Sequence, residues 1–175
     1  MIVFRTTDVD VPFFWESDRQ PAGRWHGAGE GPVQYTATTP DAAWAEFLRH
    51  QGIDDPADLA GIERAIWAIE IDDDEPTASP TLSVSTLTGG RATYLACQRA
   101  TRRLRKRGAT RLRAISAAVL PGTPSGWLTA GGLAPGPLRD EDTIVLIGSR
   151  PDLVGWISAD HGAPTGPLLA RVRWL

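Results

Sequence analysis

The chain has 175 residues, of which 42% are hydrophobic and 22% are charged, and its formal net charge at pH 7 is −3. This composition is sufficient for one globular domain with a hydrophobic core, and the net charge gives no overall attraction to nucleic acid. No apolar stretch approaches the length of about eighteen residues that a membrane span needs, and the N-terminus lacks the features of a secretory signal. We therefore expect a single cytoplasmic domain over residues 1–175, with the one cysteine, Cys97, as a small buried side chain.

Two strands are predicted near the N-terminus, with an irregular segment between them. Residues 1–6 are predicted as a short strand, and residues 7–32 are rich in the glycine, proline and aromatic residues that favour irregular structure. Apolar side chains then alternate with polar ones through Val33, Tyr35 and Ala37. This alternation predicts a strand that turns these three side chains to one face.

The segment TPD at residues 39–41 is a strong helix start. It combines a capping hydroxyl, a proline in the first turn and an acid near the positive end of the helix dipole. We expect a helix from there to about residue 50, and Gly52 is placed to end it.

The middle of the chain contains a further strand, a loop and a second helix. The run IERAIWAIEI at 62–71 fits either a helix or a strand, and its β-branched residues favour a strand over 65–71. A loop is predicted over 72–90, followed by a helix over 91–107 that ends at Gly108. The residues expected on the apolar side of this helix are Leu95, Cys97, Ala100 and Leu104.

The last third of the chain alternates between apolar runs and breakers. Residues 112–120 are predicted as a buried strand and residues 122–137 as a loop rich in glycine and proline. Residues 143–148 are predicted as another buried strand. The tail from residue 151 is weakly patterned, and its last apolar run, LLARVRWL at 168–175, is expected to form a strand.

Charge is unevenly distributed along the chain. Residues 54–75 contain nine acids and one base, whereas residues 91–113 contain nine bases and no acid. This polarity is consistent with an internal attraction or with two surfaces for different partners. One candidate function is therefore nucleic-acid binding through the basic segment 91–113, by contacts to phosphates.

Familiar catalytic and metal-binding motifs are missing from the sequence. The three histidines are scattered, so no cluster with zinc-ligand spacing is expected, and there is no P-loop or nucleophile elbow. The glycine-rich run GAGEG at 27–31 precedes a strand, whereas a dinucleotide-binding turn joins a strand to a helix. The remaining candidates are Arg24 on a turn, Tyr35 on a strand and Glu46 on the helix that follows.

The order GRW, YTA and AAWAEFL over residues 23–48 resembles the RES domain, the toxin component of a bacterial toxin–antitoxin system. That family is named for an arginine, a glutamate and a serine. Arg24, Tyr35 and Glu46 match its first three positions, and Ser116 in LRAISAAV matches the serine. The resemblance covers about residues 3–150 and leaves the tail over 151–175 unassigned.

Four positions depart from the pattern of the family. His26 stands where the family has asparagine, Ala37 replaces a serine, and Ile115 replaces the proline before the serine. Thr143 lies near the place where an asparagine is expected. These departures keep open a catalytically altered relative that acts as a binding or interaction module.

The resemblance implies a fold and an activity. RES domains resemble ADP-ribosyltransferases, which implies one α+β domain with mixed, mostly antiparallel sheets and flanking helices. They cleave the bond between nicotinamide and ribose in NAD, with water, phosphate or a protein as acceptor. NAD would thus be a substrate and no retained cofactor is expected. The implied partner is a helix-turn-helix antitoxin of the Xre type.

The residue types suit this chemistry. Glu46 would stabilise the positive charge of an oxocarbenium-like transition state and hold the ribose hydroxyls. Arg24 would grip the pyrophosphate, with Arg5 as a second grip, and Tyr35 would offer its ring to the cationic nicotinamide. Ser116 would donate a hydrogen bond to the substrate. The remaining residues expected to contact the substrate are His26 and Thr36.

Overall fold

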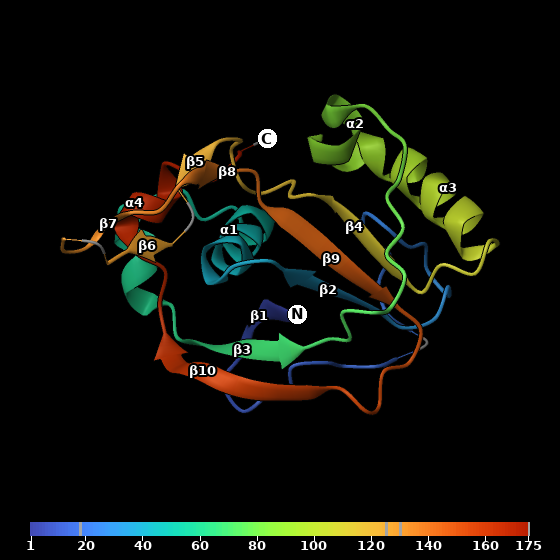
Figure 1. The fold of residues 1–175 in the computed structure, drawn as a ribbon, viewed down its shortest axis with the longest axis horizontal. Coiled ribbons are helices and arrows are strands. Elements are labelled where there is room, and N and C mark those ends of the chain that lie inside the picture. The colour runs from blue at the N-terminus through green and yellow to red at the C-terminus, as the bar shows by residue number, and fades with distance from the viewer. Residues whose placement is uncertain (18, 125, 130, 175) are drawn as a thin grey trace.

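The computed structural model of the protein describes residues 1–17, 19–124, 126–129 and 131–174. Its centre is a six-stranded sheet with the order β10-β3-β1-β2-β9-β4, in which neighbouring strands are antiparallel (Figure 1). The strands of this sheet are β1 (Ile2–Asp8), β2 (Val33–Ala37), β3 (Arg64–Glu70), β4 (Arg111–Ile115), β9 (Asp142–Ile147) and β10 (Val154–Gly162). The expected α+β class, with antiparallel sheets and flanking helices, is confirmed.

The sheet consists of two three-stranded halves that meet at one point. β1 pairs with β2 through Phe4 and Ala37, whereas β1 and β3 pair along seven positions. One half is therefore β10-β3-β1 and the other is β2-β9-β4. The predicted alternation in β2 is confirmed, because Val33 and Ala37 pack into the core on one face with Tyr35.

Helix α1 (Pro40–Gln51) forms where its start and stop signals predict it. The side chain of Thr39 accepts a hydrogen bond from the backbone N–H of Ala42, which satisfies one of the free donors of the first turn. Gly52 ends the helix in the left-handed conformation, with φ 69°, where a residue with a Cβ would be strained. The helix contacts both β1 and β2, so it lies over the joint between the two halves of the sheet.

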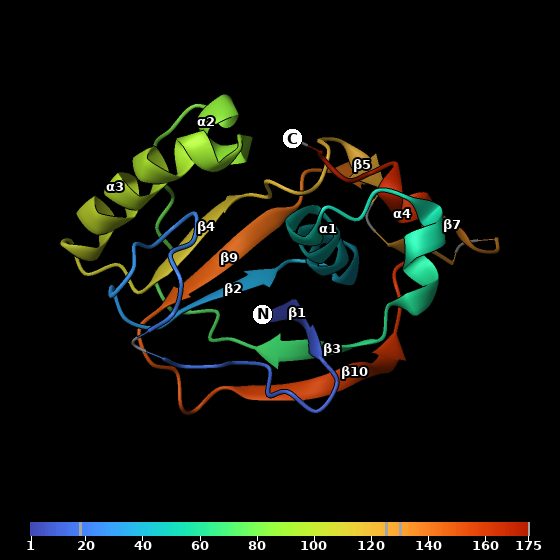
Figure 2. The same ribbon diagram turned by 180° about the vertical axis from the view of Figure 1, so that it is seen from behind.

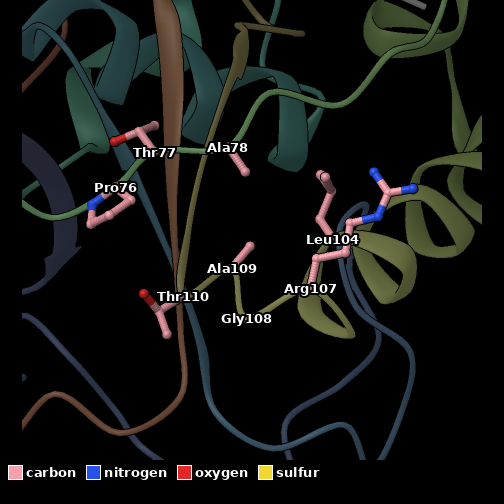
Figure 3. Close-up of a pocket in the computed structure, with 8 residues that line it drawn as sticks. All are labelled: Pro76, Thr77, Ala78, Leu104, Arg107, Gly108, Ala109 and Thr110. Atoms are coloured by element: carbon pink, nitrogen blue, oxygen red, sulfur yellow. The ribbon is translucent and has the colours of Figure 1, made fainter.

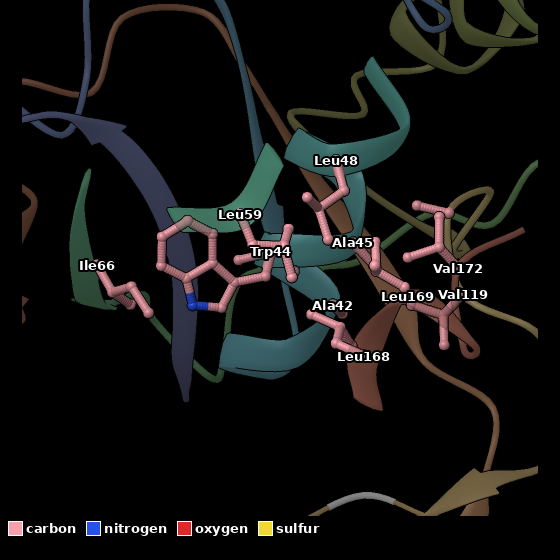
Figure 4. Close-up of a cluster of buried hydrophobic side chains, with 13 residues drawn as sticks. Ala42, Trp44, Ala45, Leu48, Leu59, Ile66, Val119, Leu168, Leu169 and Val172 are labelled. Carbon is pink, nitrogen blue, oxygen red and sulfur yellow. The ribbon is translucent and has the colours of Figure 1, made fainter. Parts of the chain in front are cut away.

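The apolar face of α1 packs into the largest buried cluster (Figure 4). Trp44, Leu48 and neighbouring alanines of α1 meet residues from the end of the chain, among them Leu168 and Val172. These come from α4 (Gly166–Leu169) and the bridge that follows it, and Leu59 is added by the 3₁₀ helix η1 (Pro56–Gly61). The tail of the chain therefore forms part of the same core as α1.

A second group of helices covers the other half of the same sheet face. α2 (Val84–Thr88), the 3₁₀ turn η2 (Arg91–Thr93) and α3 (Tyr94–Arg105) lie together beside β4, as Figures 1 and 2 show. Cys97 of α3 is fully buried against Leu112 and Val145, which confirms its expected packing role. Arg49 of α1 donates to the carbonyls of Thr88 and Gly89 at the end of α2, and the candidate site lies at this contact.

The opposite face of the sheet is covered by irregular chain. Phe13 and Phe14 pack over Val3, Ile69 and Ile144. Within the described residues, none of the helices has both the length and the apolar composition needed to cross a membrane.

Several expectations for the middle of the chain were wrong. The segment predicted as a loop over 72–90 contains α2, which is too short to show helical periodicity. Leu95 is 52% exposed, although its position was expected to face the core with Cys97. The strand predicted over 112–120 ends at Ile115, because the chain turns at Ser116.

The end of the chain also differs from the prediction. Residues 154–162 form β10, an edge strand that pairs with β3 and carries two register shifts, so its side chains do not alternate cleanly between core and solvent. The strand expected over 168–175 is α4 followed by a bridge between Val119 and Val172, and Leu175 lies outside the described residues. The segment predicted as a loop over 122–137 contains three two-residue strands in its described residues, β5 (Thr123–Pro124), β6 (Trp127–Leu128) and β7 (Ala134–Pro135), and β8 (Leu138–Arg139) follows it.

Candidate active site

The segment that carries Arg24 is tied to β2 by Tyr35. The hydroxyl of Tyr35 accepts a hydrogen bond from the backbone N–H of Trp25 at 2.9 Å and lies 2.8 Å from Nδ1 of His26. Gly23 permits this approach, since a Cβ there would lie 2.5 Å from the Tyr35 hydroxyl. Because Trp25 is itself buried in the core, Arg24 sits on a short segment that is anchored on both sides.

The guanidinium of Arg24 is largely buried and reaches the corner between α2 and α3. It donates to the carbonyl of Gly89 at 2.5 Å and to the hydroxyl of Thr93 at 3.2 Å. It also lies over the ring of Tyr94, 4.8 Å from the ring centroid, in the geometry of a cation–π contact. Arg24 therefore joins the segment before β2 to the start of α3.

Glu46 projects from α1 and is held through one of its carboxylate oxygens. Oε1 accepts hydrogen bonds from the hydroxyls of Ser116 at 3.2 Å and Thr143 at 3.3 Å. Within the described residues, Oε2 has no hydrogen-bond partner. Ser116 is itself fixed, because its Oγ accepts from the backbone N–H of Ala118 at 3.1 Å. Glu46 is therefore oriented by two donors that both act on one of its oxygens.

The sheet brings these three residues together from distant parts of the chain. Thr143 lies on β9 between Ala37 of β2 and Ala114 of β4. Two small neighbours leave room for α1 to approach the sheet at this point, and Ser116 follows directly where β4 ends. The hydroxyl of Thr143 thus lies beside Glu46, near the place where the pattern of the family has an asparagine.

Two further residues belong to this cluster and were missed in the sequence. Arg49 lies one helical turn after Glu46 on α1 and donates to the carbonyls of Ala117, Thr88 and Gly89. Tyr94 is half-buried at the start of α3, under the Arg24 guanidinium. The sequence could have indicated Arg49, because residues three apart on a helix share a face and Glu46 was already a candidate. Nothing in the sequence indicated Tyr94.

The charges of Arg24 and Glu46 act on the same two neighbouring groups, Tyr35 and Arg49. Burial raises the pKa of the Tyr35 hydroxyl, the charge of Arg24 opposes this shift and the charge of Glu46 adds to it. Burial lowers the pKa of Arg49, an effect that Glu46 opposes and Arg24 reinforces. Because Arg24 and Glu46 both act on Tyr35 and on Arg49, these four groups lie within electrostatic range of one another.

Arg5 and Thr36 are not part of this cluster. Arg5 donates to Gln34 at 2.6 Å, and Gln34 and Thr36 point to the sheet face opposite Tyr35, because side chains alternate along β2. Burial, with the nearby charge of Arg64, lowers the pKa of Arg5 to about 10. Arg5, which was expected to bind the pyrophosphate together with Arg24, is therefore separated from Glu46 by the sheet.

The basic segment over 91–113 does not form one continuous binding surface. Arg111 is 3% exposed and donates to the carbonyls of Asp72 and Glu75, so it fastens the acidic loop to β4. Arg102 and Arg105 both bind Glu30. Part of the predicted charge polarity is therefore an internal attraction.

A separate hollow of about 250 Å³ lies at the far end of β4 (Figure 3). Its lining includes Leu104, Arg107 and Thr110, with residues 76–78 on the opposite wall. Thr110 precedes β4 whereas Ser116 follows it, so the length of the strand separates this hollow from Glu46. Among the described residues, no carboxylate lines this hollow, which makes it unsuited to stabilising a developing positive charge.

Comparison with known proteins gives one family. The model described as RES domain matches residues 3–135, a range that includes Arg24, Tyr35, Glu46 and Ser116 and stops before Thr143. None of the curated proteins compared with the chain matches it.

Proposed function

Because the chain belongs to the RES domain family, we propose that it is the NAD-consuming toxin of a toxin–antitoxin module and that it cleaves the nicotinamide–ribose bond. The family is one of NAD-related toxins, and the specific reaction is our proposal. The observation that carries it is the arrangement of Glu46, whose Oε1 accepts from Ser116 and Thr143 while Oε2 has no hydrogen bond among the described residues. A carboxylate held in this way is preorganised to face a developing positive charge.

Cleavage of this bond builds positive charge on the ribose carbon as neutral nicotinamide leaves. The transition state resembles that of glycoside hydrolysis, in which a fixed carboxylate beside the ring stabilises an oxocarbenium ion. Glu46 would be this negatively charged carboxylate, and it would accept hydrogen bonds from the ribose hydroxyls. Ser116 and Thr143 donate to Glu46, so in this proposal they orient the carboxylate, and Ser116 need not act as a nucleophile.

Arg24 would bind the pyrophosphate of NAD. Its guanidinium already donates to the neutral carbonyl of Gly89 and the hydroxyl of Thr93. A phosphate oxygen would replace one of these neutral acceptors with a charged one, and charge-assisted hydrogen bonds are roughly twice as strong. The ring of Tyr94 lies under Arg24, and the cationic nicotinamide would pack on the face of Tyr35 or Tyr94.

The acceptor would be water, phosphate or a protein side chain, and the partner an Xre-type antitoxin that covers the site. Both follow from the family resemblance. The alternative of a catalytically altered relative rests on the departures at His26, Ala37, Ile115 and Thr143.

The test is nicotinamide release by the purified chain incubated with NAD. Wild type should release nicotinamide, and Glu46→Gln should lower the rate by about a hundredfold or more, since it removes the stabilising charge. Glu70→Gln, an exposed carboxylate on β3, is the matched control and should keep wild-type activity. Equal rates in wild type and Glu46→Gln would refute the proposed mechanism. NAD binding without nicotinamide release would mean that the protein is a catalytically altered relative.

A further inference from the structure

Two side chains of α1, one helical turn apart, hold the three-residue turn 116–118 that follows β4. Glu46 accepts a hydrogen bond from the hydroxyl of Ser116, and Arg49 donates to the carbonyl of the next residue, Ala117. The N–H of Ala118 then donates back to Ser116 Oγ at 3.1 Å. The orientation of the Ser116 hydroxyl therefore depends on the path of this turn.

The ends of the turn have their own anchors, and its middle depends on Arg49. The N–H of Ser116 donates to the carbonyl of Glu141 at 2.7 Å, and the carbonyl of Ala118 accepts from the N–H of Arg173 at 2.7 Å. Within the described part of the chain, Arg49 is the donor to the Ala117 carbonyl between them. Removing the guanidinium should therefore loosen the centre of the turn without unfolding it.

Arg49 also connects the turn to the corner that Arg24 occupies. Its second terminal nitrogen lies 3.1 Å from the carbonyl of Thr88 and 3.3 Å from that of Gly89, and Arg24 donates to the same Gly89 carbonyl. One guanidinium thus binds carbonyls on two separate segments. Lysine has a single ammonium at its end and would hold only one of them well.

We propose that Arg49 is a positioning residue of the site: it fixes the turn that presents Ser116 to Glu46 and links it to the corner bound by Arg24. This inference rests on the proposed function for its catalytic consequence. Arg49 would act through Ser116 and Glu46, so its loss should slow the chemical step and leave the affinity for NAD almost unchanged.

The first arm of the test measures nicotinamide release by Arg49→Met and Arg49→Lys. We expect Arg49→Met to lower kcat by about ten- to a hundredfold, the loss that a small misplacement of reacting groups causes, with KM for NAD within about threefold of wild type. Arg49→Lys should recover part of kcat. Arg103→Met, an exposed arginine of α3, is the matched control and should behave as wild type. A raised KM with unchanged kcat would overturn the proposal, because it would mean that Arg49 binds NAD directly.

The second arm requires no activity and separates the two proposals. Hydrogen exchange of the Ala118 amide should be faster in Arg49→Met than in wild type and in Arg103→Met, because the turn that orders this amide is released. Unchanged exchange would overturn the inference. If wild type releases no nicotinamide, the proposed function fails, and exchange at Ala118 still decides whether Arg49 anchors the turn. Should Arg49→Met not fold, Arg49→Gln, which also lacks the guanidinium, takes its place in the comparison.

Discussion

The hydroxyl of Tyr35 lies 2.8 Å from Nδ1 of His26, and the other ring nitrogen of His26, Nε2, lies 2.9 Å from the carbonyl oxygen of Pro21. A carbonyl only accepts, so Nε2 carries the hydrogen and the neutral Nδ1 accepts from the Tyr35 hydroxyl. Tyr35 therefore both donates to His26 and accepts from the N–H of Trp25. Through these hydrogen bonds Tyr35 of β2 fixes the position of the segment that carries Arg24.

Replacing Tyr35 by phenylalanine should destabilise the protein. The change leaves the N–H of Trp25 and Nδ1 of His26 without a partner in a largely buried place, which costs about 1–3 kcal/mol. Urea denaturation of wild type and Tyr35→Phe measures the difference in the free energy of unfolding. Tyr94→Phe is the control, since no hydrogen bond of the Tyr94 hydroxyl occurs among the described residues, and equal losses in both variants would contradict this role of Tyr35.

Stability should fall as the pH drops below about 6.5. The pKa of His26 is lowered chiefly by burial; Glu30 opposes this shift and Arg105 reinforces it. Between the lowered pKa of the folded state and the ordinary value of about 6.5, His26 therefore binds a proton in the unfolded state but not in the folded state. Stability consequently rises with pH through that window.

The measurement is thermal unfolding between pH 5 and pH 8 for wild type and for His26→Asn, which has no titrating ring. The slope between pH 5.5 and 7 should be smaller in the variant. The pKa values of Glu30 and Glu75 are also lowered, and their stabilising contribution is lost at more acidic pH, below about 4.5. An identical slope in wild type and variant would show that His26 does not titrate on unfolding.

Ser116→Ala and Thr143→Val should both reduce nicotinamide release, because each removes one donor to Oε1 of Glu46. About a tenfold loss in kcat is expected for each, and a larger loss of stability for Ser116→Ala, which also deprives the Ala118 N–H of its acceptor. Steady-state kinetics and urea denaturation of the two variants distinguish these effects. Full activity in the double variant would mean that Glu46 needs neither hydroxyl.

Trp44→Ala should cost about 3–5 kcal/mol of unfolding free energy, the usual loss for truncating a large buried aromatic side chain. Trp44 is 5% exposed and packs where α1, β3 and the chain end meet. Trp127→Ala is the control, because Trp127 is 68% exposed on β6 and its removal should change stability by no more than about 0.5 kcal/mol. Similar losses in the two variants would mean that the core has been misassigned.

The elements that were predicted well are those with strong local signals. α1 has a cap, a proline and a terminal glycine within its own sequence, and β2 has a clean alternation of side chains. α2 and β10 lack such signals, since one is a five-residue helix and the other an edge strand interrupted by register shifts. Their existence depends on the neighbours against which they lie.

The sequence by itself determined which residues are candidates for chemistry: Arg24, Tyr35 and Glu46 by their type and order, and Ser116 through the resemblance to the RES domain. The pairing of β1 with β2 puts Arg5 on the other face of the sheet, because side chains alternate between the two faces along each strand. The tertiary structure alone decided the partners of Glu46, since Ser116 and Thr143 are 70 and 97 residues away and meet it because β9 runs between β2 and β4. Local preferences act over a few residues, whereas a carboxylate is oriented by whatever donors the packing of distant strands brings within hydrogen-bond distance.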